Sequence, residues 1–171
     1  MTYEAVEPTN WPKSIIYEHA EKVGEVLGYD PSKPLEDIVT SLGGRITYQN
    51  LFEVEETNDG SIQIEEDGSF NIFLPDYVSV ERNRFTIAHE LGHYVLHREH
   101  GKRQQAARLI NASNDRAEWE ANWFAAGFLM PKSEFEKKFD ELNGHPVALA
   151  RHFRVSVQSA EIQAKNYGKV L

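Results

Sequence analysis

The sequence predicts an α+β fold, in which a small antiparallel sheet packs against several helices. Helical periodicity dominates up to about residue 43, strand patterns and turn residues fill residues 45–74, and helical periodicity returns from about residue 80 onward. Helices and strands that are segregated in this way are typical of the α+β class. The 171 residues are 40% hydrophobic and 26% charged, as in ordinary globular proteins. We therefore expect one domain over residues 1–171.

Two helices are expected before the sheet. Trp11-Pro12 opens the first, whose apolar stripe ends near Gly28 and Pro31. The second begins near Pro34 and ends at Gly43-Gly44, since glycine commonly follows the C-terminus of a helix.

Three strands follow, at Arg45–Gln49, Ile62–Glu65 and Phe70–Leu74. The last two are joined across Asp67-Gly68, which is a typical hairpin turn. We expect Ser69–Leu74 to be an edge strand, on which an extended peptide could pair beside the next helix.

The remaining chain is predicted to be helical. Ser79 can cap a helix from about Val80 to Arg98, and a helix from Asp115 to about Leu129 stops before Pro131. Three further helices are expected at Glu134–Leu142 with Ser133 as its cap, at Pro146–Phe153 and at Ser156–Tyr167.

Residues 145–171 form a subregion that resembles a helix-turn-helix. Its 4 basic and 1 acidic side chains are a small footprint for binding phosphates. We therefore expect it to close the core with its apolar side chains, namely Leu149, Phe153, Val155, Val157 and Ile162.

Charge and composition exclude several classes of protein. The net charge is −9, and residues 1–80 carry 4 basic against 16 acidic side chains, so direct nucleic-acid binding is not expected. No segment approaches the roughly 18 apolar residues of a membrane span, and the N-terminus lacks the pattern of a signal peptide. The chain has no cysteine, so any metal must be held by nitrogen and oxygen. A cytoplasmic protein is expected.

The segment His89-Glu90-Leu91-Gly92-His93 has the pattern H-E-x-x-H. Residues four apart on a helix differ by about 40° and one turn, so both imidazoles can reach one ion. Glu90 is turned by about 100° from His89, which suits a base acting on water better than a ligand. This spacing predicts one Zn²⁺ per chain, with His89 and His93 as ligands and Glu90 as the catalytic base.

A catalytic zinc ion needs a third protein ligand, for which Glu118 and Glu120 are the candidates. The helix face of Glu118 carries Ala121, Asn122 and Ala125, small groups that permit a close approach of helices. Asn122 can also hydrogen-bond a ligand from behind. We therefore favour Glu118 as the third ligand and expect Asn122 to hydrogen-bond one of the ligands.

Two blocks of sequence resemble the ImmA/IrrE family of metallopeptidases. They are Arg84-Phe-Thr-Ile-Ala-His-Glu-Leu-Gly-His-Tyr-Val-Leu-His97 and Glu118-Trp-Glu-Ala-Asn-Trp-Phe-Ala-Ala-Gly-Phe-Leu-Met-Pro131. The resemblance spans residues 12–167 and implies a zincin-like core, with zinc on His89, His93 and Glu118 and with Glu90 as base. The spacing E-x-x-x-N resembles the E-x-x-x-D of thermolysin-like sites. Gly127 departs from the larger residue that the family often has there.

The resemblance also implies a function, because family members cleave helix-turn-helix repressors of mobile elements or stress responses. We expect a site-specific endopeptidase whose partner is such a repressor. The alternative is a zinc-bearing binding module or toxin-system component that sequesters a regulator without cutting it, and which would tolerate loss of Glu90. Candidates for the donor that stabilises the transition state are Tyr94, His97, His145 and His152. His97 is interpreted as a packed or surface residue, and His100 as a surface residue.

Overall fold

The computed structural model describes residues 2–4, 7–50, 52, 61–98, 107–109 and 115–171. Along the chain these form β1 (Thr2–Glu4), α1 (Lys13–Val26), α2 (Leu35–Ser41), β2 (Gly44–Gln49), β3 (Ser61–Ile64), β4 (Phe70–Pro75), α3 (Val80–Gly92), the π-helical turn η1 (His93–His97), β5 (Ala107–Leu109), α4 (Asp115–Leu129), α5 (Lys132–Glu141), α6 (Pro146–Phe153) and α7 (Val157–Asn166). The α+β class is confirmed.

The strands form one mixed sheet in the order β1-β5-β3-β4-β2. The predicted hairpin is present, because β3 runs antiparallel to β4 with Ile62 opposite Ile72. Gly68 occupies its turn at φ 86°, a conformation that favours glycine. The sheet is not antiparallel throughout, however, because β2 runs parallel to β4 and β1 runs parallel to β5.

The prediction that Ser69–Leu74 is an edge strand is wrong. β4 lies between β3 and β2, and Ile72 is paired with Ile62 on one side and with Ile46 on the other. Phe70, Ile72 and Leu74 are all buried. β2 pairs with β4 in parallel, and parallel strands need a long connection between them. The sequence therefore contains no short turn from which this pairing could be predicted. An extended peptide therefore cannot pair with this strand, because both of its edges are already occupied.

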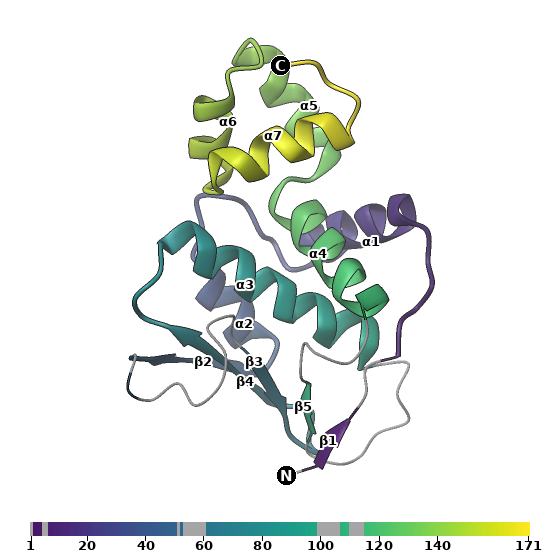
Figure 1. Ribbon diagram of the computed structural model, residues 1–171, viewed down its shortest axis with the longest axis vertical. Coiled ribbons are helices and arrows are strands. Elements are labelled where there is room, and N and C mark those ends of the chain that lie inside the picture. The colour runs from purple at the N-terminus through teal and green to yellow at the C-terminus, as the bar shows by residue number, and fades with distance from the viewer. Residues whose placement is uncertain (1, 5–6, 51, 53–60, 99–106, 110–114) are drawn as a thin grey trace.

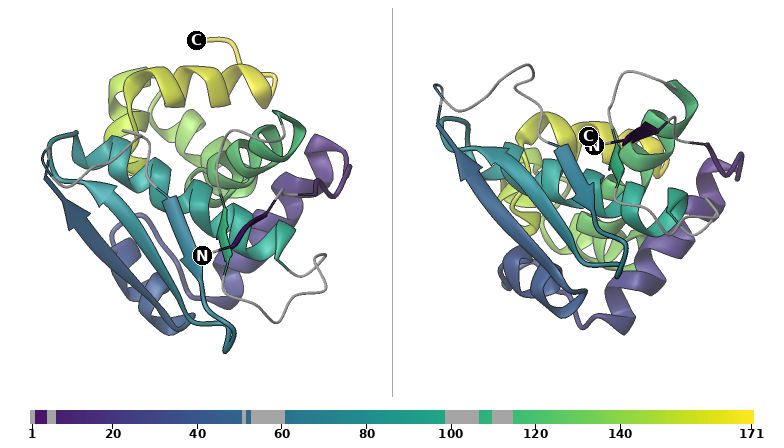
Figure 2. Two further views of the ribbon diagram at one scale, coloured as in Figure 1. Left: turned by 60° about the horizontal axis from the view of Figure 1, so that its bottom comes forward. Right: turned by 90° about the horizontal axis from the view of Figure 1, so that it is seen from below.

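The helices stack in layers beyond the sheet. α3 packs on β4, α4 packs along α3, and α1 packs along α4. Figure 1 shows the sheet at one end of the molecule and α5, α6 and α7 at the opposite end. The left view of Figure 2 shows α3 (teal) between the strands and α7 (yellow). The metal-ligand candidates thus lie on helices in the middle of the stack.

Side-chain caps fix the starts of some helices, namely α3, α6 and α7. The Ser79 side chain accepts a hydrogen bond from the Arg82 backbone N–H and caps α3, as expected. Ser133 does not cap α5, because the helix begins at Lys132, two residues before the predicted Glu134, with Pro131 as N-cap. The Ser133 hydroxyl is hydrogen-bonded to Glu21 instead. Proline at this position already presets the dihedral angle that a helix start needs.

Gly127 is explained by the packing of α1 against α4. A Cβ atom there would lie 3.0 Å from Cδ1 and 3.1 Å from Cα of Tyr17. These distances are shorter than ordinary contacts between carbon atoms, so a larger residue would force α1 away. Glycine at this position lets the two helices approach closely.

The C-terminal subregion packs on the core only in part as predicted. Leu149, Phe153 and Val155 are buried, whereas Val157 and Ile162 are 38% and 54% exposed. Val157 is the first residue of α7, and the buried face of this helix begins only at Ala160. Among the helices that the described residues form, none has the length and apolar character needed to cross a membrane.

Candidate metal centre

The candidate site lies where α3 and η1 cross α4. His89 and Glu90 lie on α3, His93 begins η1, and Glu118 and Asn122 lie on α4. The residue that permits this crossing is Gly92, since a Cβ atom there would lie 3.1 Å from Cβ of Phe124 and 3.2 Å from Cα of Ala121. The glycine inside the H-E-x-x-H motif therefore lets α4 come close enough for Glu118 to reach both histidines.

His89, His93 and Glu118 form a group that could hold a metal ion, with ligand atoms that all lie within 4.8 Å of one another. The Nε2 atom of His89 is 3.2 Å from Oε2 of Glu118, and Nε2 of His93 is 2.9 Å from Oε1. Two ligands held about 2.0 Å from one tetrahedral ion lie about 3.3 Å apart. The spacing of these three side chains therefore fits a small divalent ion between them.

Buried polar atoms in this group support the same interpretation. Both carboxylate oxygens of Glu90 are buried without a hydrogen-bond partner among the described residues, and Nε2 of His89 and Nε2 of His93 are buried against the carboxylate of Glu118. Buried polar atoms normally have a partner, and exceptions call for an explanation such as an ion. Nitrogen and oxygen donors are the ligand types that zinc accepts. These residues therefore fit the metal that the sequence predicts.

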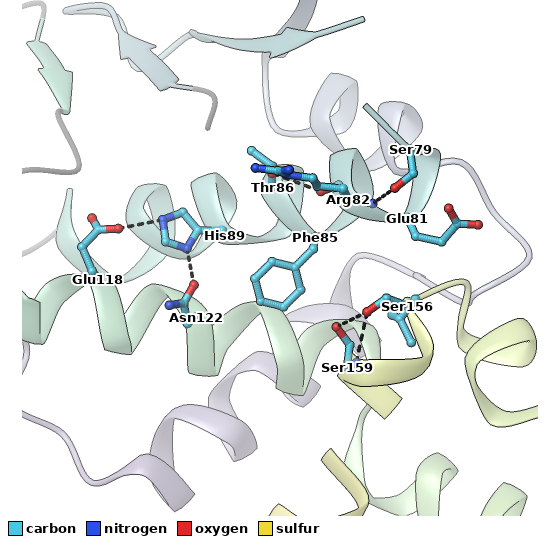
Figure 3. Close-up of a pocket in the computed structure, with 11 residues that line it drawn as sticks. Ser79, Glu81, Arg82, Phe85, Thr86, His89, Glu118, Asn122, Ser156 and Ser159 are labelled. Carbon is cyan, nitrogen blue, oxygen red and sulfur yellow. Dashed lines mark hydrogen bonds and ion pairs between the residues drawn. The ribbon is translucent and has the colours of Figure 1, made fainter. Parts of the chain in front are cut away.

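Asn122 supports His89 from the side away from Glu118. Its Oδ1 atom lies 2.8 Å from Nδ1 of His89, as Figure 3 shows. An amide oxygen only accepts hydrogen bonds, so Nδ1 of His89 donates and its Nε2 lone pair is left for a ligand. The structure thus places Asn122 behind His89, one of the candidate ligands.

His93 has a different neighbour, which sequence reasoning missed. Its Nδ1 atom lies 2.9 Å from Nδ1 of His97, whose Nε2 atom lies 3.1 Å from Oε1 of Glu120. His97 is buried, and burial together with the neighbouring His93 lowers the pKa of His97 to about 4. The signal was present in the sequence, because His97 follows His93 at the same spacing of four that separates His89 from His93.

Glu120 is fully buried and has partners other than the metal-ligand group. Its oxygens accept hydrogen bonds from the Thr9 backbone N–H at 2.7 Å, the Thr9 hydroxyl at 2.9 Å, the Asn10 backbone N–H at 2.9 Å and Nε of Arg116 at 3.0 Å. Burial alone would raise the pKa of Glu120, but these hydrogen bonds and that of His97 lower it. The structure therefore brings Glu118, and not Glu120, to the two histidines.

The electrostatics of the site follow from burial and from close contacts. Burial works against the charge of Glu118, but its contacts with His89 and His93 prevail and lower the pKa of Glu118 to about 2. Burial raises the pKa of Glu90, with partial opposition from His93 and His89. Burial also works against charge on His89, yet contact with Glu118 and the field of Glu90 raise the pKa of His89. Because an imidazole binds a metal ion through an unprotonated nitrogen, a proton and a metal ion would compete for Nε2 of His89.

A cleft of about 540 Å³ opens on one side of the metal-ligand group. Its walls come from α3, from α4 and from the start of α7, as Figure 3 shows. The residues that line it are Ser79, Glu81, Arg82, Phe85, Thr86, His89, Glu118, Asn122, Val155, Ser156 and Ser159. The C-terminal subregion thus forms one wall of the candidate site.

The predicted donors for the transition state lie elsewhere. Tyr94 donates to the Gly68 carbonyl in the hairpin turn at 2.9 Å, and Nδ1 of His145 accepts from the Ala148 N–H at the start of α6. His152 lies 3.4 Å from Glu134 on α5, and His97 lies behind His93. His100 lies outside the described residues. None of these four described candidates lines the cleft, whose described side-chain donors include Arg82, Thr86, Ser156 and Ser159.

Comparisons with known proteins agree with this geometry. Residues 52–165 match the family model Peptidase_M78, the IrrE N-terminal-like domain. No curated protein matches. A Mycobacterium tuberculosis transcriptional regulator has a similar fold, with a TM-score of 0.62 and 17% identity over 86% of this chain and 45% of that one. The chain thus spans less than half the length of that regulator. Because the family match covers most of the chain, including the histidine motif and Glu118, this protein belongs to the Peptidase_M78 family with its IrrE N-terminal-like domain.

Proposed function

We propose that this chain is a zinc-dependent endopeptidase that holds one zinc ion. The observation that carries the proposal is the convergence of His89, His93 and Glu118 beside an open cleft. The buried carboxylate of Glu90 interacts electrostatically with all three. Two imidazoles and one carboxylate are a ligand set that zinc hydrolases use. Membership of a peptidase family supports hydrolysis of peptide bonds.

The residues of the chain would divide the work as follows. His89, His93 and Glu118 would hold the ion, and Asn122 would keep His89 in the required tautomer. Bound zinc lowers the pKa of water to about 7 and polarises a carbonyl group. Glu90 would accept the proton and pass it to the leaving amine. Its pKa is raised by burial, as suits a general base that works near neutral pH.

The cleft suits an extended segment of a protein substrate. It is walled by Phe85 and Val155 as well as by polar residues, so main chain and side chains could both be contacted. A folded helix cannot present its backbone to the site, so the scissile bond would lie in a loop, a linker or a locally unfolded stretch. We propose a helix-turn-helix repressor as substrate, on the basis of the resemblance to ImmA/IrrE proteins.

The test uses purified protein and repressors encoded near its gene. We expect one zinc per chain by metal analysis, no zinc in His93→Ala, and a single cut that intact-mass and peptide mass spectrometry locate outside the helical core of one repressor. Glu90→Gln should not cut, whereas the exposed control Glu25→Gln should cut as the wild type does.

Other outcomes would redirect the proposal. Zinc at full occupancy in His93→Ala would exclude the site. Equal digestion of unrelated folded proteins would exclude the repressor specificity. Binding of a repressor without cleavage, unchanged in Glu90→Gln, would establish the sequestering module instead.

A further inference from the structure

The supporting side chains behind the two histidines are of different kinds. His89 is backed by the neutral amide of Asn122, which lines the cleft. His93 is backed by His97 and Glu120, which are 6% and 0% exposed. In a dry interior, hydrogen bonds to a charged group are stronger than those between neutral groups. The hydrogen bonds behind His93 should therefore hold its ring more firmly than the single neutral hydrogen bond holds His89.

The direction of each hydrogen bond behind His93 follows from the carboxylate at its end. Ionised Glu120 only accepts, so Nε2 of His97 must donate to it. An imidazole that carries its one hydrogen on Nε2 has a lone pair on Nδ1, so Nδ1 of His97 accepts the hydrogen on Nδ1 of His93. His93 consequently presents an unprotonated Nε2 toward Glu118, which is the form that a metal ion needs.

Glu120 is itself anchored to a distant part of the chain. Thr9 supplies two donors and Asn10 supplies one, although Thr9 precedes Glu120 by 111 positions. Arg116, one turn before Glu120 on α4, donates to Glu120 and also to the Trp11 carbonyl. The Glu120 carboxylate is thus held in place by Arg116 of α4 and by residues 9–10. In this fixed position it accepts the hydrogen bond from His97.

We infer that His97 and Glu120 are positioning residues for His93, and that the segment Thr9-Asn10-Trp11 completes their anchor. His97 and Glu120 touch neither metal nor substrate, and they act by fixing the tautomer and ring orientation of His93. The inference rests on the proposed metal site. Loss of such outer partners typically lowers metal affinity by about 10- to 100-fold.

The test compares two substitutions that remove the same ring. An asparagine at position 97 can place an amide oxygen near the position of Nδ1 and accept from His93, whereas leucine fills similar space without an acceptor. Metal-free wild type, His97→Asn, His97→Leu and the control His152→Asn are titrated with Co²⁺ in the presence of a competing chelator. The visible absorption of bound Co²⁺ reports the geometry of the ligands, and thermal unfolding of the metal-free proteins reports stability.

We expect His97→Leu to bind Co²⁺ about 10- to 100-fold more weakly, with an altered spectrum. His97→Asn should recover most of the affinity and the wild-type spectrum, even where it is the less stable of the two. A purely structural role predicts the opposite, because a polar group without its Glu120 partner is worse in a buried site than leucine. Equal Co²⁺ affinities and spectra for the two variants would overturn the inference.

A second variant covers the case in which His97→Leu does not fold. Thr9→Val keeps the shape of the side chain and removes the hydroxyl, which donates to Glu120 and accepts from the Trp11 backbone N–H within the same anchor. It should weaken Co²⁺ binding several-fold relative to His152→Asn, and an affinity equal to that control would count against the inference. Failure of the wild type to bind Co²⁺ would instead overturn the metal site itself, and with it the proposed function.

Discussion

Oδ1 of Asn122 lies 2.8 Å from Nδ1 of His89, which joins a residue of α4 to one of α3 directly behind the metal-ligand group. Glu118 lies one turn before Asn122 on the same helix and contacts Nε2 of the same imidazole. One helix therefore supplies both a candidate ligand and the hydrogen-bond acceptor that fixes the opposite edge of His89.

This relationship predicts how substitutions of Asn122 affect the metal. Asn122→Leu should weaken Zn²⁺ binding by about 10- to 100-fold, because His89 loses the acceptor that selects its tautomer. Asn122→Asp should bind Zn²⁺ at least as tightly as the wild type, since a carboxylate is the stronger acceptor. Chelator competition measures both, with Asn166→Leu on α7 as the exposed control. Equal affinity of the Leu and Asp variants would contradict a role for this hydrogen bond.

Substitution of Glu118 should mainly reduce zinc affinity, whereas substitution of Glu120 should mainly reduce stability. Loss of a residue that only supports a ligand typically lowers metal affinity by about 10- to 100-fold. Glu118→Gln should lower Zn²⁺ affinity by more than this, with little effect on the stability of the metal-free protein. Glu120→Gln should destabilise the metal-free protein by about 1–3 kcal/mol, since an amide cannot satisfy the donors of Thr9, Asn10 and Arg116 together. Chelator competition and denaturant unfolding separate the two effects. A tighter hold on zinc by Glu118→Gln than by Glu120→Gln would mean that the ligand is misassigned.

Glu90→Gln should retain zinc and lose activity. The amide cannot accept the proton, so the cleavage rate should fall by about 10²- to 10⁴-fold, the usual contribution of a general acid–base. Single-turnover cleavage of the repressor by zinc-loaded protein measures this loss, beside metal analysis of the same sample. Unchanged cleavage with full zinc would point to another base.

The same substitution should stabilise the metal-free protein in a manner that depends on pH. Burial raises the pKa of Glu90, so the folded protein resists ionisation that the unfolded chain accepts above about pH 4.3. Stability is therefore lost as pH rises from that value through the folded-state pKa, and Glu90→Gln removes the loss. Unfolding in denaturant at pH 4 and pH 8 should show a gain for Glu90→Gln that is larger at pH 8. A gain independent of pH would show that Glu90 ionises as freely in the folded protein as in the unfolded chain.

Gly92→Ala should separate α3 from α4. The added methyl group would meet Cβ of Phe124 and Cα of Ala121 at 3.1 and 3.2 Å, so we expect a loss of about 1–3 kcal/mol in the free energy of unfolding. Zn²⁺ affinity should fall as well, because Glu118 is carried away from the histidines. Gly24→Ala is the matched control, since its Cβ atom would lie 3.7 Å from Phe128. That change should be neutral or stabilising, as alanine is favoured over glycine inside a helix.

Features encoded over a few residues were predictable. The start of α3 at Ser79, the hairpin at Asp67-Gly68 and the bounds of α4 all match, because capping and turn preferences depend on neighbouring residues alone. The choice between Glu118 and Glu120 also had a local basis, in the small residues that share a helix face with Glu118. The continuous α-helix expected up to Arg98 changes into the π-helical turn η1 at His93, where Arg98 bonds back to the His93 carbonyl.

The sequence by itself determined that His89 and His93 are candidate metal ligands on one face of a helix, because the fixed rise and turn of one helix convert their spacing into geometry. Only the tertiary structure decided what surrounds them. The interior position of β4 depends on β2, and the role of His97 depends on Glu120 and Thr9. These partners are separated from one another by tens of residues or more, and no helical or strand periodicity relates them. Their contacts arise only when burial of the shared core brings the segments together.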